Sequence, residues 1–189
     1  MKNKIADIIN ESIFVKENTL QSQLKTIVAI GKAMVFCLKK GGKVIFLGNG
    51  GSAADSQHLA AELIGRFQKN RRALAAIALT TNTSIITSLA NDFGFEKVFA
   101  KQIEGLGRKN DLVVAISTSG NSANVIAAVK QSKNMGLKTI VFTGGDGGKL
   151  ANMADICLLI PSHNTARIQE AHITVGHAVC QLVEEEIFG

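Results

Sequence analysis

The sequence predicts an α/β fold in which a doubly wound parallel sheet carries helices on both faces. Five short runs are almost continuously apolar, as strands buried on both faces are. Stretches with helical spacing of apolar residues alternate with these runs, and this alternation is typical of a parallel sheet. A long helical region precedes the first run and another follows the last. The predicted order is therefore a helical arm, a doubly wound core and a closing helix.

Each element can be assigned from its own pattern. Residues 1–40 form the arm, and their helical spacing is interrupted once, near Lys16 to Thr19. The predicted strands are residues 43–48, 75–80, 111–117, 138–143 and 156–160. The predicted helices after the arm are residues 52–68, 83–90, 95–106, 122–135, 147–152 and 164–187. No linker or repeat divides the 189 residues, so we expect residues 1–189 to form a single domain.

Composition narrows the classes of function. Hydrophobic residues make up 46% of the chain, which suits a globular domain with apolar surface left for an oligomer interface. The apolar runs are too short for a bilayer and the N-terminus does not resemble a signal peptide, so we expect a cytoplasmic protein without a membrane partner. The net charge of +6 comes from scattered basic residues without interleaved aromatics, which favours a small phosphorylated substrate over nucleic acid. Cys37, Cys157 and Cys180 are widely spaced, so we expect free thiols.

A glycine-rich turn, Gly48-Asn49-Gly50-Gly51-Ser52, follows the first predicted strand and opens a helix. In open parallel sheets ligands bind beyond the carboxyl ends of the strands, which is where this turn lies. Its glycines allow backbone amides to approach a ligand, and a helix N-terminus favours an anion. The letters also fit a dinucleotide-binding pattern, but that pattern needs an acidic residue about 20 positions on, where this chain reads ALTTNTS. The turn therefore predicts a substrate contact rather than nicotinamide binding.

A second loop, Ser117-Thr118-Ser119-Gly120-Asn121-Ser122, joins the third predicted strand to a helix. Hydroxyls and amides at a helix N-terminus can hold a phosphate without a cation. The alternative is an ordinary helix N-cap, which needs only one hydroxyl. The four hydroxyls in six residues favour phosphate binding.

Two pairs of polar residues, each on its own predicted helix, could together form one metal site. His58 and Glu62 are four residues apart and share a helix face, although an ordinary surface pair has the same spacing. The closing helix adds Gln169 and His177, about two turns apart in an otherwise apolar stretch. Two histidines, a carboxylate and an amide suit a divalent metal of the zinc type. Spacing leaves open whether the two helices meet, and we expect His172 to be structural.

Six segments occur in an order that resembles the bacterial phosphoheptose isomerases, which are sugar isomerase (SIS) domain proteins. The segments are GNGGSAADSQHLAAEL, ALTTNTS, NDFGFE, ISTSGNS, TGGDGG and the ARIQE…H ending. The resemblance covers the chain from about residue 25 onward. It implies a flavodoxin-like five-stranded sheet with an N-terminal helical hairpin. It also implies a homotetramer whose active sites are built between subunits.

The resemblance further implies an activity and a set of site residues. The reaction would convert sedoheptulose 7-phosphate to D-glycero-D-manno-heptose 7-phosphate, for the heptose of lipopolysaccharide core or other surface polysaccharides. One zinc ion per subunit would be bound by His58, Glu62, Gln169 and His177. Substrate contacts would come from Asn49, Gly50, Gly51, Ser52, Glu62, Asn91, Asp92, Ser117, Thr118, Ser119, Ser122 and Gln169. A ketose–aldose isomerisation needs a base and an acid, and Glu62 and His177 suit these catalytic roles.

Two other interpretations stay open at this stage. Some SIS proteins of this size are tetrameric adaptors that bind the replication initiator DnaA, and they share the ISTSGNS-like loop and the ARIQE segment. Those adaptors lack the pair that Glu62 and His177 form here, so the sequence favours the enzyme. A third interpretation is a SIS enzyme that acts on another sugar phosphate, such as an amino sugar.

Overall fold

The computed structural model describes all 189 residues and contains one five-stranded sheet. Its strands are β1 (Val44–Gly48), β2 (Ala76–Ala78), β3 (Leu112–Ile116), β4 (Lys138–Gly144) and β5 (Ile156–Ile160). Their spatial order is β2-β1-β3-β4-β5, and every neighbouring pair is parallel. The order reverses between β1 and β3, which defines the flavodoxin-like topology and its ligand-binding switch point. The predicted doubly wound sheet is confirmed.

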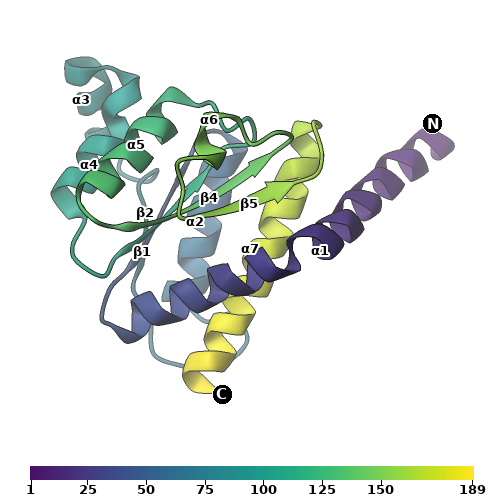
Figure 1. Cartoon of the computed structure of the whole chain (residues 1–189), viewed down its shortest axis with the longest axis horizontal. Coiled ribbons are helices and arrows are strands. Elements are labelled where there is room, and N and C mark those ends of the chain that lie inside the picture. Colours follow the sequence, from purple (N-terminus) through teal and green to yellow (C-terminus); the bar gives the residue numbers. More distant parts are fainter.

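Helices cover both faces of the sheet (Figure 1). They are α1 (Lys2–Lys39), α2 (Gly51–Ile64), α3 (Thr83–Phe93), α4 (Val98–Leu106), α5 (Ala123–Asn134), α6 (Gly148–Ala151) and α7 (Thr165–Phe188), with a short 3₁₀ helix at Phe95–Lys97. Helices α1, α2 and α7 pack on one face, and α4 and α5 pack on the other. None of the helices is both long enough and apolar enough to cross a bilayer.

Each strand supplies side chains to two separate cores. Phe46 and Phe142 lie in the core beneath α1, α2 and α7, whereas Ile45 and Val141 lie in the core beneath α4 and α5. Because successive strand residues point to opposite faces, both alternating sets must be apolar. This double burial explains the continuous apolar runs in the sequence.

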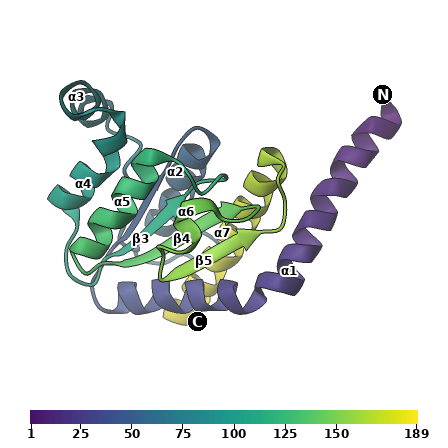
Figure 2. The same cartoon turned by 45° about the horizontal axis from the view of Figure 1, so that its top comes forward.

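The expected N-terminal helical hairpin is wrong. Helix α1 is continuous from Lys2 to Lys39, through the predicted interruption near Lys16 to Thr19. The helix changes direction part-way along its length instead of folding back (Figure 2). The buried Thr19 hydroxyl donates a 2.7 Å hydrogen bond to the Val15 carbonyl one turn earlier, a contact that often bends helices. The irregular pattern in the sequence therefore accompanies a bend rather than a turn.

Helix α2 ends at Ile64, four residues before the predicted end at residue 68. The backbone amides of Phe67, Gln68 and Lys69 donate to the carboxylate of Glu184 on α7 instead of continuing the helix. Hydrogen bonds to a carboxylate that is distant in the sequence thus override the local helical pattern.

His172 is structural, as predicted, and it should make stability depend on pH. Its side chain is buried against Phe142, and its Nε2 lies 3.1 Å from the Thr143 carbonyl. Burial lowers the pKa of His172 to about 4, although the bond to Thr143 opposes the shift. Between about pH 6.5 and pH 4 the unfolded chain binds a proton that the folded chain excludes, so stability should fall as the pH falls through this window.

We expect this group to contribute up to about 3 kcal/mol to the difference in unfolding free energy between pH 7 and pH 4. Urea unfolding of the wild type and of His172→Gln at several pH values would measure it. The variant should show a shallower decline between pH 6.5 and pH 4. Equal slopes would contradict a neutral, buried His172.

Candidate functional site

Helices α2 and α7 lie side by side and run in the same direction. At their beginnings, a Cβ added to Gly51 would lie 2.6 Å from the Gln169 amide nitrogen. Further along, a Cβ added to Gly176 would lie 2.6 Å from the side chain of Leu59. Such an approach leaves no room for a larger residue at either glycine without a shift of its neighbours. The helices therefore meet, which spacing in the sequence could not establish.

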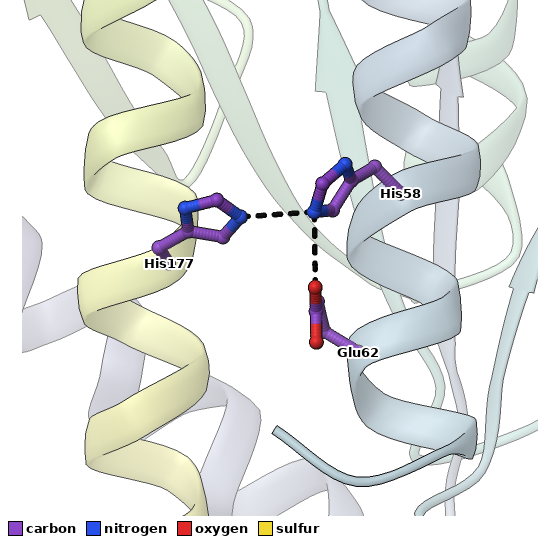
Figure 3. A group of neighbouring side chains, drawn as sticks. All are labelled: His58, Glu62 and His177. Atoms are coloured by element: carbon purple, nitrogen blue, oxygen red, sulfur yellow. Dashed lines mark hydrogen bonds and ion pairs between the residues drawn. The ribbon is translucent and has the colours of Figure 1, made fainter. Parts of the chain in front are cut away.

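Three polar side chains converge between these helices (Figure 3). The Nε2 of His58 lies 2.9 Å from Oε1 of Glu62 on the same helix, and 3.0 Å from Nε2 of His177 on α7. One ligand atom from each residue lies within 4.8 Å of the others. The His58 side chain is 48% exposed and that of Glu62 is 23% exposed, so a small molecule can reach the group.

The chemistry of this group fits a divalent metal ion. One proton on His58 Nε2 can satisfy only one of its two neighbours, whereas a cation between them would accept lone pairs from all three residues. Ligand atoms of a tetrahedral ion with bonds of about 2.0–2.1 Å lie about 3.3 Å apart, close to the observed 2.9 and 3.0 Å separations. His58, Glu62 and His177 could therefore hold a metal with little movement.

The glycine-rich turn joins this helix pair to the switch point of the sheet. Gly50 directly precedes α2 and has φ 55° and ψ −122°. Residues with a side chain rarely adopt this conformation, whereas glycine does so readily. The side-chain amides of Asn49 and Asn124 exchange two hydrogen bonds of 2.8 and 2.9 Å, which link the turn after β1 to α5. Ser52, in the first turn of α2, is only 3% exposed.

The serine-rich loop after β3 does not form an ordinary N-cap. Ser122 occupies the N-cap position of α5, but its side chain makes no capping bond and its hydroxyl lies 3.0 Å from that of Ser117. The first-turn amides of α5 therefore keep their capacity for an anion. Thr118 and the exposed Ser119 also line a cavity of about 260 Å³, together with Gly145 and His163.

The chain is similar in sequence and in structure to proteins of one family. The SIS-domain family profile matches residues 9–144. The chain is 54% identical to a phosphoheptose isomerase of Roseiflexus sp. (strain RS-1) over 97% of this chain and 93% of the relative. The structure of a phosphoheptose isomerase from Neisseria gonorrhoeae superposes with a TM-score of 0.92 at 45% identity, covering 97% and 98% of the two chains. A phosphoheptose isomerase from Francisella tularensis gives a TM-score of 0.94 at 40% identity, covering 97% of both.

This chain belongs to the phosphoheptose isomerase family. It is an isomerase of the SIS type, and its substrate is a phosphosugar. The relatives do not favour the alternative of an adaptor that binds DnaA.

Two of the residues implied by the resemblance to phosphoheptose isomerases lie apart from the His58 group. Asn91 and Asp92 are exposed on α3, where the Asn91 amide donates to the Asp92 carboxylate at 2.9 Å. Helix α3 lies beyond α4, at the opposite side of the molecule from α7 (Figures 1 and 2). Within one chain, these two residues are not brought to the converging histidines.

The patterns in the sequence did not single out Asp55, which lies near His58 in the structure. Burial raises the pKa of Asp55 to about 6, although the charge of His58 opposes the shift. One of its carboxylate oxygens is buried without a hydrogen-bond partner. Its position three residues before His58 places both on one helix face, and this spacing was the available signal.

The approach of α2 and α7 can be tested at Gly176. Replacement by alanine should lower the free energy of unfolding by about 1–3 kcal/mol, because the new methyl group must displace Leu59. It should also weaken binding of a divalent metal, because His177 is the next residue. Thermal unfolding and cobalt titration measure the two effects.

Gly105→Ala is the matched control, since Gly105 lies in α4 with open space at its Cβ position. That variant should be neutral or slightly stabilised. If Gly176→Ala behaves like Gly105→Ala, the close packing of the two helices is wrong.

Proposed function

We propose that this chain interconverts sedoheptulose 7-phosphate and D-glycero-D-manno-heptose 7-phosphate, in the synthesis of heptose for lipopolysaccharide core or other surface polysaccharides. The observation that carries the proposal is the convergence of His58, Glu62 and His177 in a member of the phosphoheptose isomerase family. We further propose that residues 1–189 act as one SIS domain in the cytoplasm, with residues 1–40 as an arm for assembly.

Two side chains perform the proton transfers. Glu62 removes a proton from C1 of the ketose, next to the carbonyl at C2, while His177 supplies a proton to the carbonyl oxygen. Removal of the C1 hydroxyl proton and return of a proton to C2 then give the aldose. Oε1 of Glu62 faces His58, which leaves the other carboxylate oxygen for substrate. A positioned acid and base of this kind contribute about 10²–10⁴-fold each to a rate.

A zinc ion, one per subunit, is the proposed cofactor. His58, Glu62 and His177 would hold it, with the amide oxygen of Gln169 as a fourth ligand from the start of α7. When bound, the metal polarises the substrate carbonyl and stabilises negative charge on the adjacent oxygens. Glu62 and Gln169 would also touch the substrate.

The sugar phosphate would span the switch point between β1 and β3. Ser117, Thr118, Ser119 and Ser122 bind the phosphate at the uncapped start of α5. Asn49, Gly50, Gly51 and Ser52 contact the sugar from the turn before α2. The phosphate thus anchors the end of the substrate that does not react.

Assembly into a homotetramer would complete the site. Helix α3 buries none of its residues in the isolated chain, and Phe93 at its end is 53% exposed. Helix α1 also carries exposed apolar residues along its length, namely Ile5, Ile8, Ile9, Ile13, Phe14, Leu20, Leu24, Val28 and Phe36. Such surfaces are typical of subunit interfaces. Asn91 and Asp92 on α3 would then serve the site of a neighbouring subunit.

The base is tested with Glu62→Gln. Turnover of sedoheptulose 7-phosphate, followed by NMR with zinc present, should fall by about 10²-fold or more because the carboxylate is lost. His177→Ala should lose both turnover and bound metal. Glu104→Gln, on the exposed face of α4, is the matched control and should keep full activity.

Near-normal turnover by Glu62→Gln would overturn the assignment of the base. If the zinc-loaded wild type itself forms no aldose phosphate, the proposed reaction is wrong.

The phosphate site is tested by replacing Ser119 and Ser122 with alanine. Hydrogen bonds to a charged group contribute about 1.5–3 kcal/mol, so the KM for the sugar phosphate should rise by about tenfold or more. The kcat should change less, because the phosphate is remote from the transferred proton. Steady-state kinetics separate the two constants, and an unchanged KM would show that the phosphate binds elsewhere.

A further inference from the structure

A buried ion pair joins the two helices beyond the converging histidines. Glu184 lies on α7 seven residues after His177, about two turns along the same face. Arg71 lies in the segment that follows α2, and its Nε donates to Glu184 Oε2 at 2.6 Å. Both side chains are only 2% exposed. Among the basic residues of the run Lys69-Asn70-Arg71-Arg72, the side chain of Arg71 is therefore buried in the interior.

Glu184 organises the segment that follows α2. Its carboxylate accepts the backbone amides of Phe67, Gln68 and Lys69 at 3.2, 2.8 and 2.7 Å. Burial alone would raise the pKa of Glu184, but these amides and Arg71 outweigh it and lower the pKa to about 2. The ring of Phe67 in turn lies 5.8 Å from the ring of His177, centroid to centroid. Glu184 thereby fixes a residue that packs against one of the converging histidines.

Arg71 holds the other helix by its backbone. Its Nη2 donates to the carbonyl of Glu62 at 2.9 Å, and its Nη1 donates to the carbonyls of Leu63 and Gly65 at 2.9 Å each. Carbonyls at a helix C-terminus lack partners within the helix and attract a cation. The last turn of α2, which carries Glu62, is therefore fixed through Arg71 to the charge on α7.

Burial of two charges costs several kcal/mol per ion, and a well-packed apolar pair can stabilise a fold as well or better. This pair makes two contacts that an apolar pair could not make. Arg71 donates to the backbone carbonyl of Glu62, and Glu184 accepts the amide of Phe67, whose ring packs against His177. A metal site needs its ligands held within about 0.5 Å of their productive geometry.

We propose that Arg71 and Glu184 are positioning residues for the metal-binding and proton-transferring group. The pair fixes the separation of α2 and α7, and so the distance between Glu62 and His177, at the end of the site opposite Gln169. This inference rests on the proposed metal-dependent isomerase, and it adds two residues that touch neither the metal nor the substrate.

Cobalt binding provides a readout that does not depend on turnover. Glu184→Gln keeps the shape of the side chain but loses its charge, and Arg71→Lys keeps the charge but loses the fork that reaches the three carbonyls. Titration with Co²⁺, followed by visible absorption, should give a dissociation constant about tenfold higher in both variants, as for other residues that support metal ligands. The kcat should fall with little change in KM, because the phosphate loop is untouched.

Asp111→Asn is the matched structural control. Asp111 is also a buried carboxylate that accepts two backbone amides, of Lys43 and Arg108, and pairs with a lysine, but it lies at the opposite ends of the strands. It should lower the melting temperature without changing the cobalt affinity or spectrum. All measurements are made well below the melting temperature of the least stable variant, and Arg71→Lys decides the matter if Glu184→Gln does not fold.

Unchanged cobalt affinity and kcat in folded Arg71→Lys or Glu184→Gln would overturn the inference and leave the pair a purely structural role. The same holds if Asp111→Asn weakens cobalt binding as much. Failure of the wild type to bind cobalt would instead contradict the proposed metal site, so the two failures are distinguishable.

Discussion

The parallel packing of α2 against α7 is the constraint on which the rest of the site depends. Neither helix alone carries a complete set of groups, since His58 and Glu62 come from one and His177 from the other. Gly176 allows the close approach because it leaves room for Leu59, and His177 follows it directly. The core beneath both helices holds them on the same face of the sheet. The convergence of the three side chains therefore depends on a helix spacing to which the hydrophobic core and the close approach at Gly176 both contribute.

The sheet topology determines what can lie next to this helix pair. Because the strand order reverses between β1 and β3, the loops that follow these strands diverge to opposite faces and leave a crevice between them. One loop begins α2 and the other begins α5, and the Asn49–Asn124 amide pair joins them. A phosphate bound at α5 would thus lie beyond the same sheet edge as the start of the helix that carries His58 and Glu62. This arrangement suits a substrate with one charged end and a reactive carbonyl at the other.

The predictable and unpredictable features of the molecule differ in physical origin. The strands could be predicted because burial on both faces demands continuous apolar runs, as in Leu112–Ile116. The pairing of His58 with Glu62 followed from helical periodicity. The end of α2 was missed, because Glu184, more than a hundred residues away, binds the amides that would extend that helix. The hairpin was wrong because a hydrogen bond from Thr19 to a backbone carbonyl accompanies a bend without ending the helix. The meeting of His177 with His58 depends on tertiary packing, and local sequence carries no signal for it.

The central claim is that α2 and α7 together bind one metal ion through His58, Glu62 and His177. Anomalous diffraction at the zinc edge, on crystals of the zinc-loaded protein, tests this claim most directly. We predict one strong peak per chain between the two helices, within bonding distance of both Nε2 atoms and of the Glu62 carboxylate. A well-occupied zinc peak elsewhere, or a fully zinc-soaked crystal with no peak between the helices, would contradict it.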